Sequence, residues 1–246
     1  MLFFVVIHLF FSSSSQAALR PIIGGEQVIK SDVISRTTAG LVSTSALGQA
    51  LCTVSLVADD LAVTAAHCVR VAPGEPRAIL TLIFGRDLHA PENQKRTVDQ
   101  VEIPDGAADV ALLHFDGGLP ADYQFAKLLP FDHELSVGDP VTLAGYGIWS
   151  AERNDGEGFL RKAQVTVSNP HYSSTEIEFD QSQGRGACHG DSGGPAYFLV
   201  NKKPYLFGIT SRGGGNCDQK VVYTTIGSLA DWFSDAGQVM RAKSTH

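Results

Sequence analysis

The sequence predicts an all-β protein, and three observations point to that class. Among its 246 residues are 25 glycines and 11 prolines, which favour many turns over long helices. Apolar residues make up 43% and charged residues 18%, so the chain has the material for a packed core and does not resemble a disordered one. Its apolar runs are mostly short. This length accommodates one large domain or two small ones.

A series of short segments is predicted to form strands, because each is an apolar or alternating run bounded by turn residues. They are 51–57, 61–65, 78–84, 110–115, 141–146, 162–167, 196–200, 205–210 and 221–225. Residues 200–204 are typical of a hairpin loop, 154–158 of a surface loop, and 117–120 of a linker between two halves. One terminal helix is predicted, with Ser228 as its cap and apolar residues at helical spacing through Met240.

The N-terminus has the pattern of an export signal. The apolar run 2–11 is followed by serines and then by small residues at Ser15 and Ala17, which suit a signal peptidase. As a helix this run rises only about 15 Å, roughly half the hydrocarbon thickness of a membrane. We therefore expect a signal peptide over 1–17, no membrane span, and a secreted or periplasmic mature protein.

The net charge and the cysteine content indicate which binding partners and cross-links to expect. The net charge is −7 and the Lys-Arg neighbours are scattered doublets, so no nucleic-acid-binding face is expected. The four cysteines, Cys52, Cys68, Cys188 and Cys217, are an even number in a chain expected to be exported, which favours two disulfides. Spacing alone leaves three pairings open. No second ligand stands at zinc spacing, so no metal site is expected.

Three segments carry residues that suit catalysis. His67 lies in the segment 64–68 at the end of an apolar strand, Asp109 immediately precedes the apolar run 110–115, and Ser192 lies among glycines in 190–195. A single histidine is more often structural, and an aspartate before a strand is more often simply solvated. The flanking glycines, however, free the backbone to present the Ser192 hydroxyl beside converging amide N–H groups.

These three residues supply the parts of a nucleophilic site. A serine needs a base to remove its proton, and the base needs a carboxylate to orient it. The α/β-hydrolase order requires a histidine well placed after the serine, but only His246 follows. The subtilisin order requires an aspartate before the histidine, and Asp59 and Asp60 lie too close to His67. The order His, Asp, Ser remains.

With these motifs the sequence resembles the chymotrypsin-trypsin family of serine endopeptidases over the whole mature chain. The matching segments are 22–25, 64–68, 109–113, 144–147, 190–195, 208–211 and the Trp-containing terminal helix. The resemblance implies two six-stranded antiparallel β-barrels packed face to face, with a C-terminal α-helix and an active-site cleft between the barrels. We expect an N-terminal barrel over 22–122 and a C-terminal barrel with the helix over 123–246. The resemblance also pairs Cys52 with Cys68 and Cys188 with Cys217.

The resemblance assigns roles in peptide-bond hydrolysis. His67 is the general base and then the acid, Asp109 orients it, and Ser192 forms the acyl-enzyme. The N–H groups of Gly190 and Ser192 form the oxyanion hole. Ser211 supports the catalytic aspartate, whereas Arg212 departs from the family's usual Trp.

Activation is expected to pair the new terminal ammonium of Ile22 with Asp191, which makes the precursor a zymogen. Residues 18–21 would be a short propeptide. Pro21 stands where family members commonly carry Arg or Lys, so an unusual peptidase is expected to release Ile22.

The same family pattern places Gly186 at the floor of the specificity pocket, with Ala187, Ser211, Gly213 and Val221 around it. Without an acidic floor residue, a substrate Arg or Lys would be buried unpaired. We expect small or medium apolar side chains before the scissile bond.

Polypeptide substrates and protein protease inhibitors are the expected partners of a monomer that needs no cofactor and no metal. Two alternatives remain: a catalytically inactive relative that serves as a binding module, and an esterase on the same fold.

Overall fold

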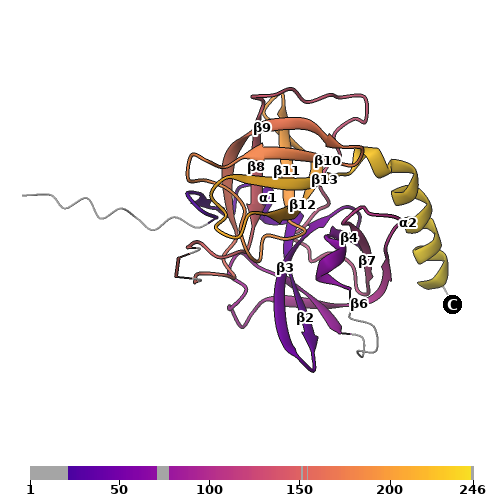
Figure 1. Ribbon diagram of the computed structural model, residues 1–246. Coiled ribbons are helices and arrows are strands. Elements are labelled where there is room, and N and C mark those ends of the chain that lie inside the picture. Colours follow the sequence, from indigo (N-terminus) through magenta and orange to yellow (C-terminus); the bar gives the residue numbers. More distant parts are fainter. Residues whose placement is uncertain (1–21, 71–77, 151, 154, 245–246) are drawn as a thin grey trace, which may run out of the picture.

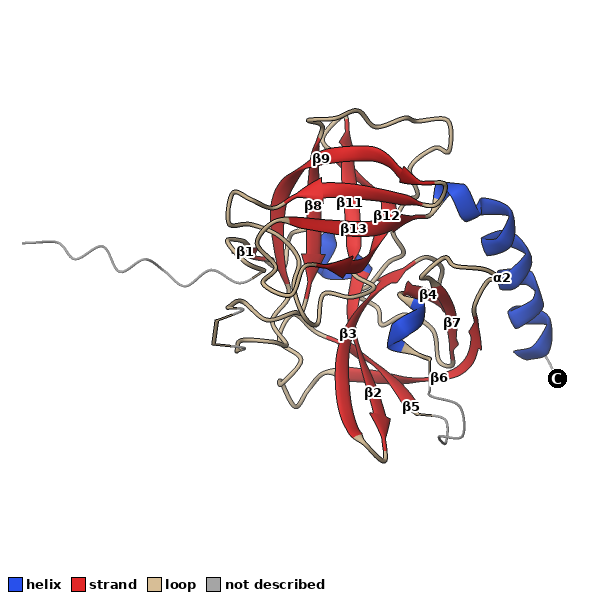
Figure 2. Ribbon diagram, viewed as in Figure 1, coloured by secondary structure: helices blue, strands red, loops and turns tan. Residues whose placement is uncertain are grey.

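Strands dominate the computed structural model, which describes residues 22–70, 78–150, 152–153 and 155–244. They gather in two groups, one above the other in the view of Figure 1, with few helices between or around them (Figure 2). The expected signal peptide and propeptide, 1–17 and 18–21, lie outside the described residues.

The first group is a closed antiparallel barrel of six strands in the order β2-β3-β4-β7-β6-β5. Its strands are β2 (Thr38–Ser45), β3 (Gly48–Leu56), β4 (Leu61–Thr64), β5 (Ile79–Phe84), β6 (Gln94–Glu102) and β7 (Ala111–Phe115). The interior is a cluster of buried apolar side chains that includes Leu41, Val54, Leu82 and Leu113. Closure leaves this barrel without an unpaired strand edge.

The second group is also a closed ring of six antiparallel strands, because β8 pairs with both β11 and β9. Its strands are β8 (Pro140–Gly145), β9 (Arg161–Ser173), β10 (Glu176–Asp180), β11 (Pro195–Val200), β12 (Lys203–Gly213) and β13 (Lys220–Thr225). Val141, Phe179, Phe207 and Tyr223 are among its core residues. The expected all-β fold of two six-stranded barrels with a terminal helix is therefore confirmed.

Each end of the described chain packs on the barrel of the other half. Strand β1 (Glu26–Gln27) pairs with β9 of the second barrel and is followed by the short helix α1 (Ile34–Thr37). Helix α2 (Ala230–Ser244) runs along the side of the molecule (Figure 1), and its Ala236 and Met240 pack on Leu61 and Leu112 of the first barrel.

The start of the terminal helix differs from the expected one. A 3₁₀ turn, η2 (Gly227–Leu229), precedes α2, and Ser228 lies inside that turn. The Ser228 hydroxyl donates to the Thr225 carbonyl, 2.9 Å away, so it bonds backward to the strand and does not cap the helix. Among the described residues no helix is long and apolar enough to cross a membrane.

Candidate active site

His67 is fixed by two hydrogen bonds to one carboxylate. Strand β4 leads into the 3₁₀ turn η1 (Ala66–Cys68), which carries the histidine at the surface. Its backbone N–H donates to Asp109 Oδ1 at 3.0 Å, and its ring Nδ1 lies 2.8 Å from Asp109 Oδ2. Because a carboxylate only accepts, the Nδ1 atom carries the proton. Nε2 is left as the acceptor that a general base requires.

A third donor holds Asp109. Ser211, on β12, donates its hydroxyl to Asp109 Oδ2 at 2.8 Å. Burial by itself raises the pKa of Asp109, but the hydrogen bonds from His67 and Ser211 outweigh it and leave the pKa below its usual value. Asp109 therefore stays ionised at neutral pH beside the imidazole.

Ser192 is attached to the first barrel next to His67. Its carbonyl oxygen accepts a hydrogen bond from the Thr53 N–H at 2.8 Å and lies 3.8 Å from Cys68 Sγ, one residue after the histidine. The following Gly193 N–H donates to the Thr210 carbonyl at 2.8 Å, which ties the serine loop to β12. Within the described chain, no hydrogen bond joins the Ser192 hydroxyl to the His67 ring. Such bonds are often long in free enzymes.

The peptide groups on both sides of Gly190 are held in place. The His189 carbonyl accepts from the Ile148 N–H at 2.8 Å, and the Gly190 carbonyl accepts from Thr53 Oγ1 at 3.0 Å. In a trans peptide the N–H of Gly190 points away from the His189 carbonyl. Gly190 has φ +92°, and a Cβ there would lie 2.8 Å from Gly147 Cα, so only glycine fits.

Sequence reasoning missed Thr53. This residue is fully buried, and its hydroxyl also accepts a hydrogen bond from the Tyr146 N–H at 3.1 Å. A threonine after a cysteine carries no recognisable pattern, since its partners Gly190 and Tyr146 lie far away in the sequence. Only the packing of the two barrels brings these residues together.

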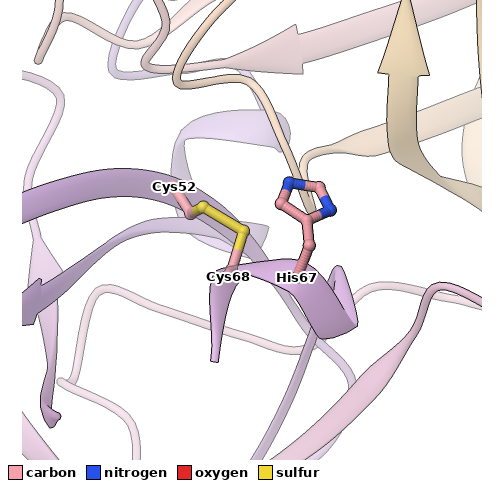
Figure 3. Close-up of side chains that lie close together, drawn as sticks. All are labelled: Cys52, His67 and Cys68. Atoms are coloured by element: carbon pink, nitrogen blue, oxygen red, sulfur yellow. A yellow bond between two sulfur atoms is a disulfide. The ribbon is translucent and has the colours of Figure 1, made fainter. Parts of the chain in front are cut away.

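Two disulfides brace the site and match the pairing that the resemblance implies. Cys52 bonds Cys68 directly beside His67 (Figure 3), and Cys188 bonds Cys217. A disulfide sulfur offers no thiolate to a metal ion. The groupings of these cysteines with His67 and with His189 are therefore not metal-binding sets.

Asp191 is buried without a cation in contact among the described residues. Its carboxylate accepts from the N–H groups of Gly147 and Cys188, each at 2.8 Å. Burial raises its pKa to about 7 despite those two hydrogen bonds. Ile22 is also buried, and the neighbouring Ile23 carbonyl accepts from the Gly186 N–H at 2.9 Å. The start of the described chain is thus anchored close to the serine loop.

The expected pocket residues come from two facing segments. Ala187 is buried one residue after Gly186, and the disulfide from Cys188 joins this segment to the loop after β12. On β12, Gly213 lies opposite Val221 of β13. A Cβ on that glycine would approach the Val221 side chain to 3.7 Å.

Arg212, next to Ser211, forms an ion pair with Glu176 near the site. Its guanidinium binds both carboxylate oxygens of Glu176, one of them at 3.1 Å, and lies 5.8 Å from the Tyr172 ring. A charged pair therefore stands next to Ser211, at the position where the resemblance leads one to expect Trp.

Comparison with known proteins identifies the family. The family model described as Trypsin matches residues 22–233. The chain belongs to the trypsin family. A relative, Trypsin-1 of Astacus astacus, is 27% identical over 206 residues, covering 74% of this chain and 85% of the relative. As a trypsin-family member, the protein is a serine-type endopeptidase with polypeptide substrates.

Proposed function

We propose that the protein hydrolyses peptide bonds through His67, Asp109 and Ser192. His67 Nε2 takes the proton of the Ser192 hydroxyl as the oxygen attacks the carbonyl carbon, and returns it to the leaving amine. Water then attacks the acyl-enzyme by the same route. The observation that carries this proposal is the double hydrogen bond from His67 to Asp109, supported by Ser211.

The N–H groups of Gly190 and Ser192 would stabilise the oxyanion that forms during both steps. The bonds from Ile148 and Thr53 to the carbonyls on either side of Gly190 support this role. Loss of one such donor lowers the rate of a serine protease about a hundred- to a thousandfold.

Secretion and activation form the next part of the proposal. Two disulfides in a trypsin-family protein suggest an extracellular protein. We assign 1–17 to a signal peptide and 18–21 to a propeptide whose removal frees the Ile22 ammonium. That ammonium would pair with Asp191, whose buried carboxylate lacks a cation in the described chain.

The specificity pocket would take small or medium apolar side chains and not Arg or Lys. Gly186 supplies no carboxylate, and Val221 is 1% exposed and directed toward Gly213. A buried cation without a partner is strongly disfavoured. The barrels would correspond to domains over 22–122 and 123–246, with a boundary in the connection between β7 and β8. The enzyme would act as a monomer and be open to protein inhibitors.

The test uses protein whose N-terminus has been verified as Ile22. A fluorophosphonate probe should label Ser192, and peptides ending in Ala, Val or Leu should be cleaved with higher kcat/KM than those ending in Arg. Absence of labelling would refute the triad. If the Arg peptide has the highest kcat/KM, the proposed apolar specificity of the pocket is wrong. If the protein hydrolyses esters but not peptides, it is an esterase.

A further inference from the structure

Gln181 is a polar residue in an apolar row. Strand β10 pairs with β13 so that Ile177 lies opposite Tyr223 and Phe179 opposite Val221. Successive residues of a strand alternate between faces, so the side chain two positions on, that of Gln181, continues the row that faces the second-barrel core. Gln181 extends the pairing, since its N–H donates to the Gln219 carbonyl at 2.9 Å. Its side chain is fully buried.

The amide of Gln181 uses only one of its ends. Nε2 donates to the Ala187 carbonyl at 3.3 Å, which fixes the orientation of the amide because a carbonyl only accepts. Oε1 is buried and has no hydrogen-bond partner among the residues that the structure describes. An unpaired buried acceptor is unfavourable by itself, so a donor brought to it contributes more than an exposed hydrogen bond would.

Gln181 also explains why position 186 is glycine. A Cβ on Gly186 would collide with Oε1 of Gln181 and lie 2.6 Å from its Cβ. The side chain of Gln181 therefore fills the space that a side chain at position 186 would occupy. The group beneath the segment Gly186–Ala187 thus comes from the residue that directly follows β10.

Val221 lies on the neighbouring strand, two residues after the Gln219 that accepts from Gln181. Val221 is opposite both Phe179 on β10 and Gly213 on β12. The two pocket positions expected from the sequence, Gly186 and Gly213, thus lie against the Gln181 amide and the Val221 side chain, respectively. Ser192 lies on the same chain segment as Gly186, six residues further on.

We propose that Gln181 is a specificity-determining residue, which selects an uncharged substrate side chain ending in a hydrogen-bond donor. The proposal rests on the proposed catalytic site and deepens its specificity. Apolar side chains of the same size enter but leave Oε1 unpaired. A substrate carboxylate is disfavoured because Oε1 is itself an acceptor, and a substrate cation is disfavoured because it would be buried without a counter-charge. A hydroxyl or carboxamide group on the substrate side chain donates a hydrogen bond to Oε1 of Gln181.

The first experiment compares kcat/KM for three pairs of peptides that differ only before the scissile bond: Thr with Val, Asn with Leu, and Gln with Met. The wild-type enzyme should favour the donor about tenfold in at least one pair. Gln181→Met keeps the side-chain size and should remove that preference. Gln183→Met, a change at an exposed neighbour, should retain it.

Gln181→Glu provides a second variant. A carboxylate at this position should raise kcat/KM for a Lys substrate about tenfold relative to the apolar ones. Titration of Ser192 with a fluorophosphonate counts the active molecules of each variant, so a failed catalytic site is separated from a failed specificity residue. If every donor peptide is cleaved no faster than its apolar partner, or if both Gln181 variants keep the wild-type ranking, the proposal is wrong.

Discussion

The N–H of Thr53 donates to the carbonyl of Ser192 across 2.8 Å, and this bond links the two barrels at the serine. The same threonine uses its hydroxyl to hold the Gly190 carbonyl and to accept the Tyr146 N–H. Strand β3 of the first barrel thus sets the position of the serine loop, which belongs to the second.

Thr53→Val should lower kcat with little change in KM. The variant keeps the backbone bond to Ser192 but loses both bonds of the hydroxyl. The Gly190 carbonyl then has no donor from Thr53, and the Gly190 N–H is positioned only through the His189 carbonyl for the oxyanion, which forms only in the transition state. We expect a loss of about tenfold or more in kcat. Steady-state kinetics on one peptide test this, with Thr53→Ser as the control that retains activity. An equal rise in KM with unchanged kcat would contradict the positioning role.

Ser192→Ala and His67→Ala should each abolish nearly all turnover. The base and the nucleophile act as a unit, so removing either one has about the same effect as removing both. Thermal unfolding should change little, because His67 is exposed and Ser192 is held by its backbone. His171→Ala, at another exposed histidine, serves as the control. Substantial activity in either active-site variant would refute the assignment.

The uncleaved chain should lose stability as the pH rises from about 4 to about 7. Burial raises the pKa of Asp191 from 3.8 to about 7, so in this window the folded chain keeps a proton that the unfolded chain has released. The contribution of Asp191 to the free energy of unfolding is therefore largest below pH 4 and falls through the window. Denaturant unfolding at pH 5 and pH 8 measures it. Asp191→Asn should flatten the difference, and an unchanged slope would contradict the assignment.

Met240→Ala should destabilise the protein by about 2 to 5 kcal/mol, because this side chain is fully buried between α2 and the first barrel. Val239→Ala, at a half-exposed neighbour, should stay within about 0.5 kcal/mol. Equilibrium unfolding in urea compares the two variants. Similar losses in both variants would contradict the role of Met240 packing, because alanine favours the helix more than either residue it replaces.

Strands with an alternating or continuous apolar pattern could be predicted from the sequence, and strands defined by their neighbours could not. Strand β6 contains charged residues such as Lys95 and Asp99, which interrupt any apolar run. Only its pairing with β5 and β7 therefore identifies it as a strand. In β10, Glu178 is buried but bonds Ser168 and Lys220, which hides the strand pattern from a reading of hydrophobicity.

The same distinction holds at the site. His67, Asp109 and Ser192 lie in short motifs whose residue types reveal their chemistry, and the structure brings the first two into contact. Thr53 and Gln181 have no such motif. Their importance depends on partners such as Gly190 and Ala187, which only the folded structure shows to be in contact with them.

The exchange of terminal segments between the barrels has a consequence for how the chain assembles. Strand β1 completes the outside of the second barrel, and α2 covers Leu61 and Leu112 of the first. The first barrel therefore keeps an uncovered apolar surface until helix α2 has been synthesised and folded. Arg241 then binds Asp60 through two hydrogen-bond donors, and Lys243 binds Glu102. Such contacts between distant parts of a chain form late and slow its folding. Because α2 follows the second barrel and packs on the first, we expect the contacts between the two barrels, such as that of Thr53 with Ser192, to be among the last to form.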